Sequence, residues 1–160
     1  MKTKYTPIHS LVKYIGLKLG NNLKFEEKNV GQSLIVNGME FSIFREIYLL
    51  TDLTIRNEGA AIFQVVFYAP ERTVDTIIKR TDYTIPFFVG LPGFCNKQFM
   101  VDRESKAFSG EYEWATVENA KDYANSYAVS FMRRRSKPCP LSYKIIEKSS
   151  GKTIEERILK

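Results

Sequence analysis

Residues 108–124 read FSGEYEWATVENAKDYA, and this stretch combines the two patterns that decide the fold. In the first half Tyr112 and Trp114 alternate with glutamates, which is typical of a β-strand covered on one face. Thr116 then serves as a helix N-cap, and small or apolar residues recur at helical spacing as far as about Arg135. We therefore predict a strand followed by one helix that packs on the aromatic face of the sheet. The buried stripe expected for this helix is Val117, Ala120, Ala124, Tyr127, Ala128 and Phe131.

The segments on either side complete a βαββαβ order. The expected strands cover 61–69, 96–101, 108–115 and 141–147. Thr73 caps the first helix, which breaks near Pro86. Such a split βαβ pattern makes an antiparallel sheet with helices on one face. We therefore predict an α+β protein with a ferredoxin-like domain over residues 57–147.

An N-terminal extension over residues 1–56 precedes this domain. Residues 7–19 predict a helix whose apolar stripe packs on its own domain, with a membrane-surface helix as the alternative. Asn37-Gly38 lies between two apolar runs and predicts a β-hairpin with a type I′ turn. Residues 51–59 are expected to connect the extension to the domain, and the polar tail over 148–160 is expected to be frayed or weakly helical.

The composition is that of a folded protein, with 160 residues of which 44% are hydrophobic and 26% charged. The net charge of +6 would suit nucleic acid, but 12 basic residues face 11 acidic ones between Asn57 and Glu147. The third strand also carries two acids where an RNA-recognition module has bases, so we expect no nucleic-acid partner. No apolar run approaches the roughly 20 residues of a membrane span, and we expect no membrane partner. Cys95 and Cys139 are expected to be free thiols, in a cytoplasmic protein.

Three short motifs occur in a characteristic order: Leu91-Pro92-Gly93-Phe94, then Gly110-Glu111-Tyr112, then Ala120-Lys121-Asp122-Tyr123. Over about residues 60–147 they make the chain resemble the dimeric α+β barrel family, which includes the antibiotic-biosynthesis-type monooxygenases and proteins of the YdhR type. The resemblance implies a homodimer formed by two sheets and a ligand cavity between each sheet and its own helices. Some members oxidise polycyclic phenols with no metal or flavin, and others degrade haem.

The candidate ligand-binding residues combine this resemblance with the pattern of the chain. Tyr112 and Trp114 would form a flat wall for an aromatic ligand, or else ordinary core. Asn96 would hold a ligand oxygen, or else lie at the surface. Phe88 and Tyr127 would complete the pocket from the helices. No catalytic residue is identified.

Several other features of the sequence do not indicate a binding or catalytic site. His9, the only histidine, lies outside the matched region, which argues against haem binding. Arg133-Arg134-Arg135 ends a helix, where cations complement the helix dipole, and an acidic substrate is the alternative. No metal-ligand spacing and no phosphate-binding glycine loop is present, so we expect no metal and no cofactor.

The sheet face away from the helices would pair with a second copy. Residues expected on this open face are Lys97, Phe99, Val101, Glu111, Glu113, Lys144 and Ile146. Two hypotheses for function stay open. One is a homodimeric binding protein for a small apolar or aromatic molecule, with or without cofactor-free monooxygenase activity. The other is a non-catalytic binding or assembly module of the same fold.

Overall fold

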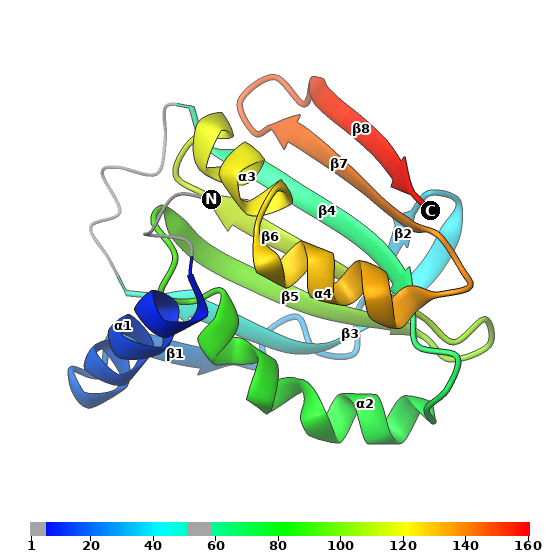
Figure 1. The fold of residues 1–160 in the computed structure, drawn as a ribbon, viewed down its shortest axis with the longest axis horizontal. Coiled ribbons are helices and arrows are strands. Elements are labelled where there is room, and N and C mark those ends of the chain that lie inside the picture. The colour runs from blue at the N-terminus through cyan, green and yellow to red at the C-terminus, as the bar shows by residue number, and fades with distance from the viewer. Residues whose placement is uncertain (1–5, 51–58) are drawn as a thin grey trace.

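One antiparallel sheet with helices on one face makes up the protein in the computed structural model, which describes residues 6–50 and 59–160 (Figure 1). The strands are β1 (Leu23–Glu26), β2 (Ser33–Val36), β3 (Met39–Leu49), β4 (Ala61–Tyr68), β5 (Phe94–Asp102), β6 (Ala107–Trp114), β7 (Leu141–Glu147) and β8 (Thr153–Leu159). The helices are α1 (Pro7–Leu19), α2 (Val74–Arg80), the 3-10 helix η3 (Thr81–Phe87), α3 (Val117–Ala124) and α4 (Tyr127–Ser136). The connection expected over 51–59 lies, apart from Gly59, outside the described residues.

The strand order establishes the fold class. The sheet runs β1-β3-β5-β6-β4-β7-β8, with β2 paired to β3 alone. Its four central strands, β5-β6-β4-β7, have the order of a ferredoxin-like βαββαβ unit, with α2 and η3 in one crossover and α3 and α4 in the other. The predicted α+β fold is confirmed. Strands β3 and β8 continue the same sheet beyond the two edges of this unit (Figure 1).

Local signals in the sequence fix several elements as expected. Asn37 and Gly38 have φ of 51° and 79°, as a type I′ turn requires, and they join β2 to β3. The hydroxyl oxygens of Thr73 and Thr116 accept the amide N–H of the residue three positions on, and so cap α2 and α3. The first crossover helix changes from α-helix to the 3-10 helix η3 at Thr81, before the break expected near Pro86, which lies inside η3.

The second crossover helix is interrupted, which the sequence analysis did not predict. Instead of one helix as far as Arg135, α3 ends at Ala124 with Asn125 as its C-cap, and α4 begins after Ser126. The Asn125 side-chain amide donates to the Lys121 carbonyl at 2.9 Å, a local bond that competes with continuation of the helix. Both α3 and α4 contact β4 and β7.

The C-terminal tail is a strand, so the expectation of a frayed or weakly helical tail was wrong. Residues of β8 pair with β7 from Leu141↔Leu159 to Ile146↔Thr153. The Tyr143 hydroxyl donates to Glu155 at 2.7 Å and adds a side-chain contact between the two strands. This polar segment forms hydrogen bonds with backbone groups along the edge of β7 that would otherwise be free.

Helix α1 lies where it was predicted, but its apolar stripe does not face the domain. Its large apolar residues stay exposed, at fractions of 76% for Ile8, 46% for Leu11, 65% for Val12, 49% for Ile15 and 82% for Leu19. The helix docks through another side, where the Ser10 hydroxyl donates to the Pro86 carbonyl at 2.5 Å. A Cβ atom at Gly90 would lie 2.2 Å from the Ser10 carbonyl oxygen, so only glycine permits this approach. The expected packing of the stripe was therefore wrong. Within the described ranges, no helix is long and apolar enough to cross a bilayer.

The core between sheet and helices is built on aromatic rings. Phe63 lies at its centre, with ring centroids 5.0 Å from Tyr123 and 5.1 Å from Tyr143. Trp114 is fully buried and its ring lies 4.7 Å from that of Tyr123. Tyr112 and Trp114 thus both face the helices, as their spacing predicted.

The faces of β5 are reversed relative to the prediction. Lys97, Phe99 and Val101 were expected on the open face, and all three lie on the helix face. A register shift between Phe94 and Asn96 is the reason: Phe94 pairs with Trp114, and Asn96 already pairs with the next residue, Glu113. Such a bulge adds one residue to one strand and exchanges its faces from that point on.

Candidate functional site

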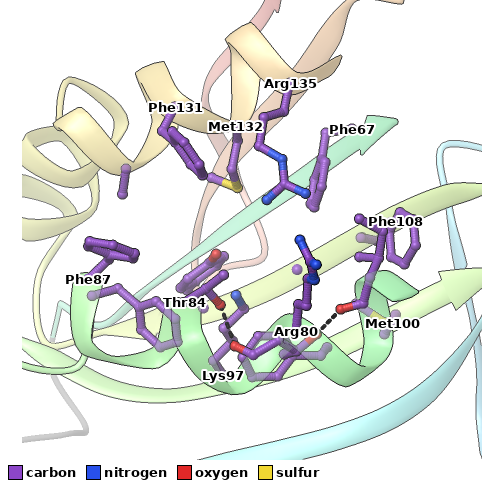
Figure 2. A pocket seen from close by; sticks show the side chains of 18 of the residues that line it. Phe67, Arg80, Thr84, Phe87, Lys97, Met100, Phe108, Phe131, Met132 and Arg135 are labelled. Carbon is purple, nitrogen blue, oxygen red and sulfur yellow. Dashed lines mark hydrogen bonds between the residues drawn. The ribbon is translucent and has the colours of Figure 1, made fainter. Parts of the chain in front are cut away.

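A cavity of about 330 Å³ lies between the sheet and the helices α2, η3 and α4 (Figure 2). Its floor comes from β4, β5 and β6, and most of its lining is apolar. The side chains shown around it include Phe67, Phe87, Phe108, Phe131 and Met132, with Lys97, Arg80 and Arg135 among them. The volume falls in the range of roughly 300–1,000 Å³ found for ligand pockets.

The sequence-predicted site residues divide between this cavity and its surroundings. Phe88, Tyr112 and Tyr127 line the cavity together. Trp114 lies deeper in the core, outside the lining, and its indole nitrogen has no hydrogen-bond partner among the described residues. Asn96 lies on the open face, where its amide donates to Glu113 at 2.7 Å. Ligand binding by these residues stays a prediction.

Lys97, which the sequence pattern placed on the open face of the sheet, is an ionisable residue buried in the cavity. It is only 6% exposed, and its amine lies over three rings, with the nitrogen 3.7 Å from the centroid of Phe99, 4.2 Å from Tyr112 and 4.4 Å from Phe88. Gly110 makes room for it, since a Cβ atom there would lie 2.8 Å from the Tyr112 ring and 3.3 Å from Cε of Lys97. The sequence shows Lys97, Gly110 and Tyr112, but only the β5 bulge places the lysine on the same face of the sheet as the tyrosine.

The environment of the Lys97 amine favours its neutral form. No carboxylate in the described part of the chain forms an ion pair with it, and burial holds the pKa of the Lys97 ammonium well below its ordinary value. The three rings act in the opposite sense, each favouring a cation by roughly 0.5–2 kcal/mol. Loss of hydration is the larger effect for an amine closed off from water, so the cavity holds a basic nitrogen.

The tyrosine hydroxyls of the cavity are protonated and already in use. Burial raises the pKa of Tyr112, whose hydroxyl shares a hydrogen bond with Tyr123. Burial also raises the pKa of Tyr127 to about 12, and its hydroxyl donates to the Phe87 carbonyl. Lys97 is therefore the group in the cavity interior best suited to accept a proton.

Arginines gather where the cavity opens. Arg80 at the end of α2 and Arg135 at the end of α4 line the cavity, and their guanidinium groups point toward one another across the gap between these helices (Figure 2). Burial, followed by the nearby charges of Arg72 and Arg80, lowers the pKa of Arg135. Of the Arg133-Arg134-Arg135 run, Arg134 and Arg135 turn toward the cavity, whereas Arg133 donates to the Lys160 carbonyl at 2.9 Å.

Other groups considered from the sequence lie away from the cavity. His9 is half-buried on α1 and is not among the cavity residues. Cys95 and Cys139 are free thiols, as predicted. In residues 6–50 and 59–160 no cluster of three or more histidine, cysteine, aspartate or glutamate side chains could hold a metal ion. The expectation of no metal and no cofactor stays a prediction.

The fold and the cavity together define a ferredoxin-like α+β protein with an aromatic-lined internal pocket. Among solved structures, the chain is similar to one described as an uncharacterized ferredoxin fold protein related to antibiotic biosynthesis monooxygenases, from Listeria monocytogenes 4b F2365, with a TM-score of 0.46, 13% identity, and 91% and 85% of the two chains covered. It is also similar to a structure described as a major regulator of staphylococcal pathogenesis, with a TM-score of 0.48, 10% identity and 91% of each chain covered. Both are distant likenesses of fold at low sequence identity. No protein-family model and no curated protein matches the chain.

Replacing Lys97 with methionine should flatten the dependence of stability on pH. An amine whose pKa is lowered by folding binds more protons in the unfolded chain, so the free energy of unfolding of the wild type should rise with pH between the lowered pKa and the ordinary value near 10.4. The variant lacks this contribution and should gain most over the wild type at the low end of that window. Denaturant unfolding of both proteins between about pH 6 and pH 10 measures this. Parallel pH profiles for the two proteins would mean that the three rings stabilise the ammonium as well as water does.

Proposed function

We propose that this protein binds a small apolar or aromatic molecule in the cavity between its sheet and helices. The observation that carries the proposal is an internal space of about 330 Å³ lined by Phe87, Phe88, Phe99 and Tyr112 from both layers. Rings on opposite walls suit a flat apolar ligand, because they exclude water and stack on its faces.

Lys97 gives the ligand one polar contact. Its amine is held at a fixed place by three rings, so a hydroxyl or carbonyl oxygen of the ligand next to it would gain a hydrogen bond with little ordering cost. A ligand without such an oxygen would leave the amine buried and unpaired, which costs free energy. An aromatic ligand that carries an oxygen is therefore favoured over one that does not.

A cofactor-free oxidation is the chemical activity that Lys97 would support. A neutral amine could take the proton of a phenol, and the phenolate would then supply electrons to oxygen. For 1-naphthol the balance is one O₂ consumed, with one naphthoquinone and one water formed. The alternative is a non-catalytic binding or assembly module, in which Lys97 only orients the ligand.

The protein is proposed to be cytoplasmic, which the free thiols support. A homodimer is proposed to form through the open face of the sheet. The half-buried residues of this face include Ile62, Gln64, Glu111 and Ile146. Its polar groups are already paired, since Gln64 donates to Glu111 at 3.1 Å and Lys148 to Glu113 at 2.7 Å. Polar side chains that are satisfied within one chain lower the cost of covering them with a second.

Ligand binding is tested with N-phenyl-1-naphthylamine, a neutral aromatic probe that fluoresces in apolar surroundings. The wild type should bind it, and Ala128→Phe should weaken binding at least about tenfold, because the added ring occupies the cavity. Ser130→Phe adds the same ring at an exposed position on α4 and should leave the affinity unchanged. Equal affinities for the two variants, or no binding by the wild type, would contradict the proposal.

Oxidation is tested by oxygen uptake with 1-naphthol. If Lys97 acts as the base, Lys97→Met should abolish uptake by about a hundredfold or more while binding the neutral probe within about threefold of the wild type. Lys144→Met, on the open face, removes a lysine that pairs with Glu156 and should keep full activity. No uptake by the wild type would favour the non-catalytic module.

Light scattering tests the dimer. The wild type should have about twice the chain mass of 18.5 kDa at micromolar concentration. Ile62→Lys places a charge on the open face and should give monomers that still bind the neutral probe. A monomer mass for the wild type would contradict the proposed homodimer.

A further inference from the structure

We propose that the ligand of the cavity is an amphipathic anion, whose acidic group is held between Arg80 and Arg135 at the mouth while its apolar body lies inside. This inference rests on the proposed function and names the chemical class of the ligand. The acidic group could be a carboxylate, a sulfonate or a phosphate monoester.

The first support is the meeting of two like charges. Arg80 and Arg135 come from different helices, 55 positions apart in the chain, and their guanidinium groups point toward each other (Figure 2). Neither forms an ion pair with a carboxylate in the part of the chain that the structure describes. Two guanidinium groups placed this way repel one another, and an anion between them converts the repulsion into two charge-assisted hydrogen bonds.

The second support is that the cavity continues into a basic groove. Arg80, Thr84, Phe87, Phe131, Arg134 and Arg135 line both the cavity and this outer groove. The groove adds Arg72 and Lys137, and Glu71 is the acid in its lining. A ligand that fills the apolar interior must therefore present its outer end to a concentration of positive charge.

The third support is the way Arg135 is held. Its guanidinium carbon lies 5.4 Å from the centroid of the Phe131 ring, and Phe131 itself lines the cavity. A guanidinium stacked on a ring is preorganised to use its fork on an acid group. The same contact places that fork next to the apolar lining, as an amphipathic ligand requires.

A small molecule fits these observations better than nucleic acid does. Basic side chains at a surface would serve a phosphate backbone, but here they surround the entrance of an apolar pocket. Buried Lys97 at the floor adds a basic nitrogen that has no ion pair among the described residues, and it lies out of reach of a duplex. The arrangement matches a molecule with one acidic end and one aromatic end.

Two matched probes test the inference with the whole 160-residue chain. N-Phenyl-1-naphthylamine is neutral, and 1-anilinonaphthalene-8-sulfonate has the same rings with one sulfonate added. The wild type should bind the anionic probe at least about tenfold more tightly, and added salt should weaken only that probe. Mutual competition between the probes would place both in the cavity.

Variants then locate the acidic group. The double variant Arg80→Gln, Arg135→Gln should lose the preference for the anionic probe, to within about twofold, and should still bind the neutral one, which shows that the cavity is intact. Arg133→Gln is the matched control, because this arginine bonds the Lys160 carbonyl instead of lining the cavity. It should keep the preference.

The outcomes separate the two proposals. If neither probe binds, the proposed binding function fails. If both bind equally well to the wild type, the cavity binds ligands but the arginines do not hold an acid, and this inference is wrong. Loss of the preference in Lys97→Met, with the double variant unaffected, would place the acid at the floor and overturn the position at the mouth. Tight, salt-dependent binding of a short RNA that displaces neither probe would assign the arginines to nucleic acid instead.

Discussion

The bulge in β5 between Phe94 and Asn96 is the constraint on which the site depends. One extra residue lets Phe94 face the helices together with Trp114, and then returns Lys97 and Phe99 to that same face. Without it, an uninterrupted alternation from Phe94 would turn Asn96 and Gln98 toward the helices and expose Lys97 on the open face. The basic nitrogen of the cavity thus follows from this one of the register shifts in the sheet.

The consequence is a division of polar groups between the two faces of the sheet. On the open face polar groups are paired: Glu46 is fully buried and accepts bonds from Asn29, Tyr48 and Gln98, which outweigh its burial and lower its pKa. On the helix face Lys97 has rings around it and no such partner among the described residues. A folded protein seldom leaves a buried ionisable amine unpaired, and function is a common reason for the exception.

The segments outside the βαββαβ unit extend the sheet, but no role follows for the exposed apolar stripe of α1. Strands β1 and β3 extend one edge and β8 the other, which reduces the exposed backbone of the central strands. Helix α1 closes on Gly90 through Ser10 and keeps Ile8, Val12 and Leu19 in solvent. Its amphipathic pattern therefore predicts the helix correctly but does not predict which side of the helix is buried.

The sequence by itself determined the features that depend on neighbouring residues. These are the Asn37-Gly38 turn, the caps at Thr73 and Thr116, and the inward direction of Tyr112 and Trp114. Each follows from local sterics or from a hydrogen bond within a few positions. They support the βαββαβ order, and the expectation of a pocket containing Phe88 and Tyr127 followed from that order together with the family resemblance.

Only the tertiary structure decided the chemistry of the pocket. The face of Lys97 depends on how β5 pairs with β6, and its contacts join β5, β6 and the segment after η3. The meeting of Arg80 with Arg135 depends on how two crossover helices lie over one sheet, and the β8 strand depends on a free edge of β7. Periodicity describes a single segment, whereas register, bulges and helix placement are set by packing between residues far apart in the chain, so the sequence pattern alone could not supply them.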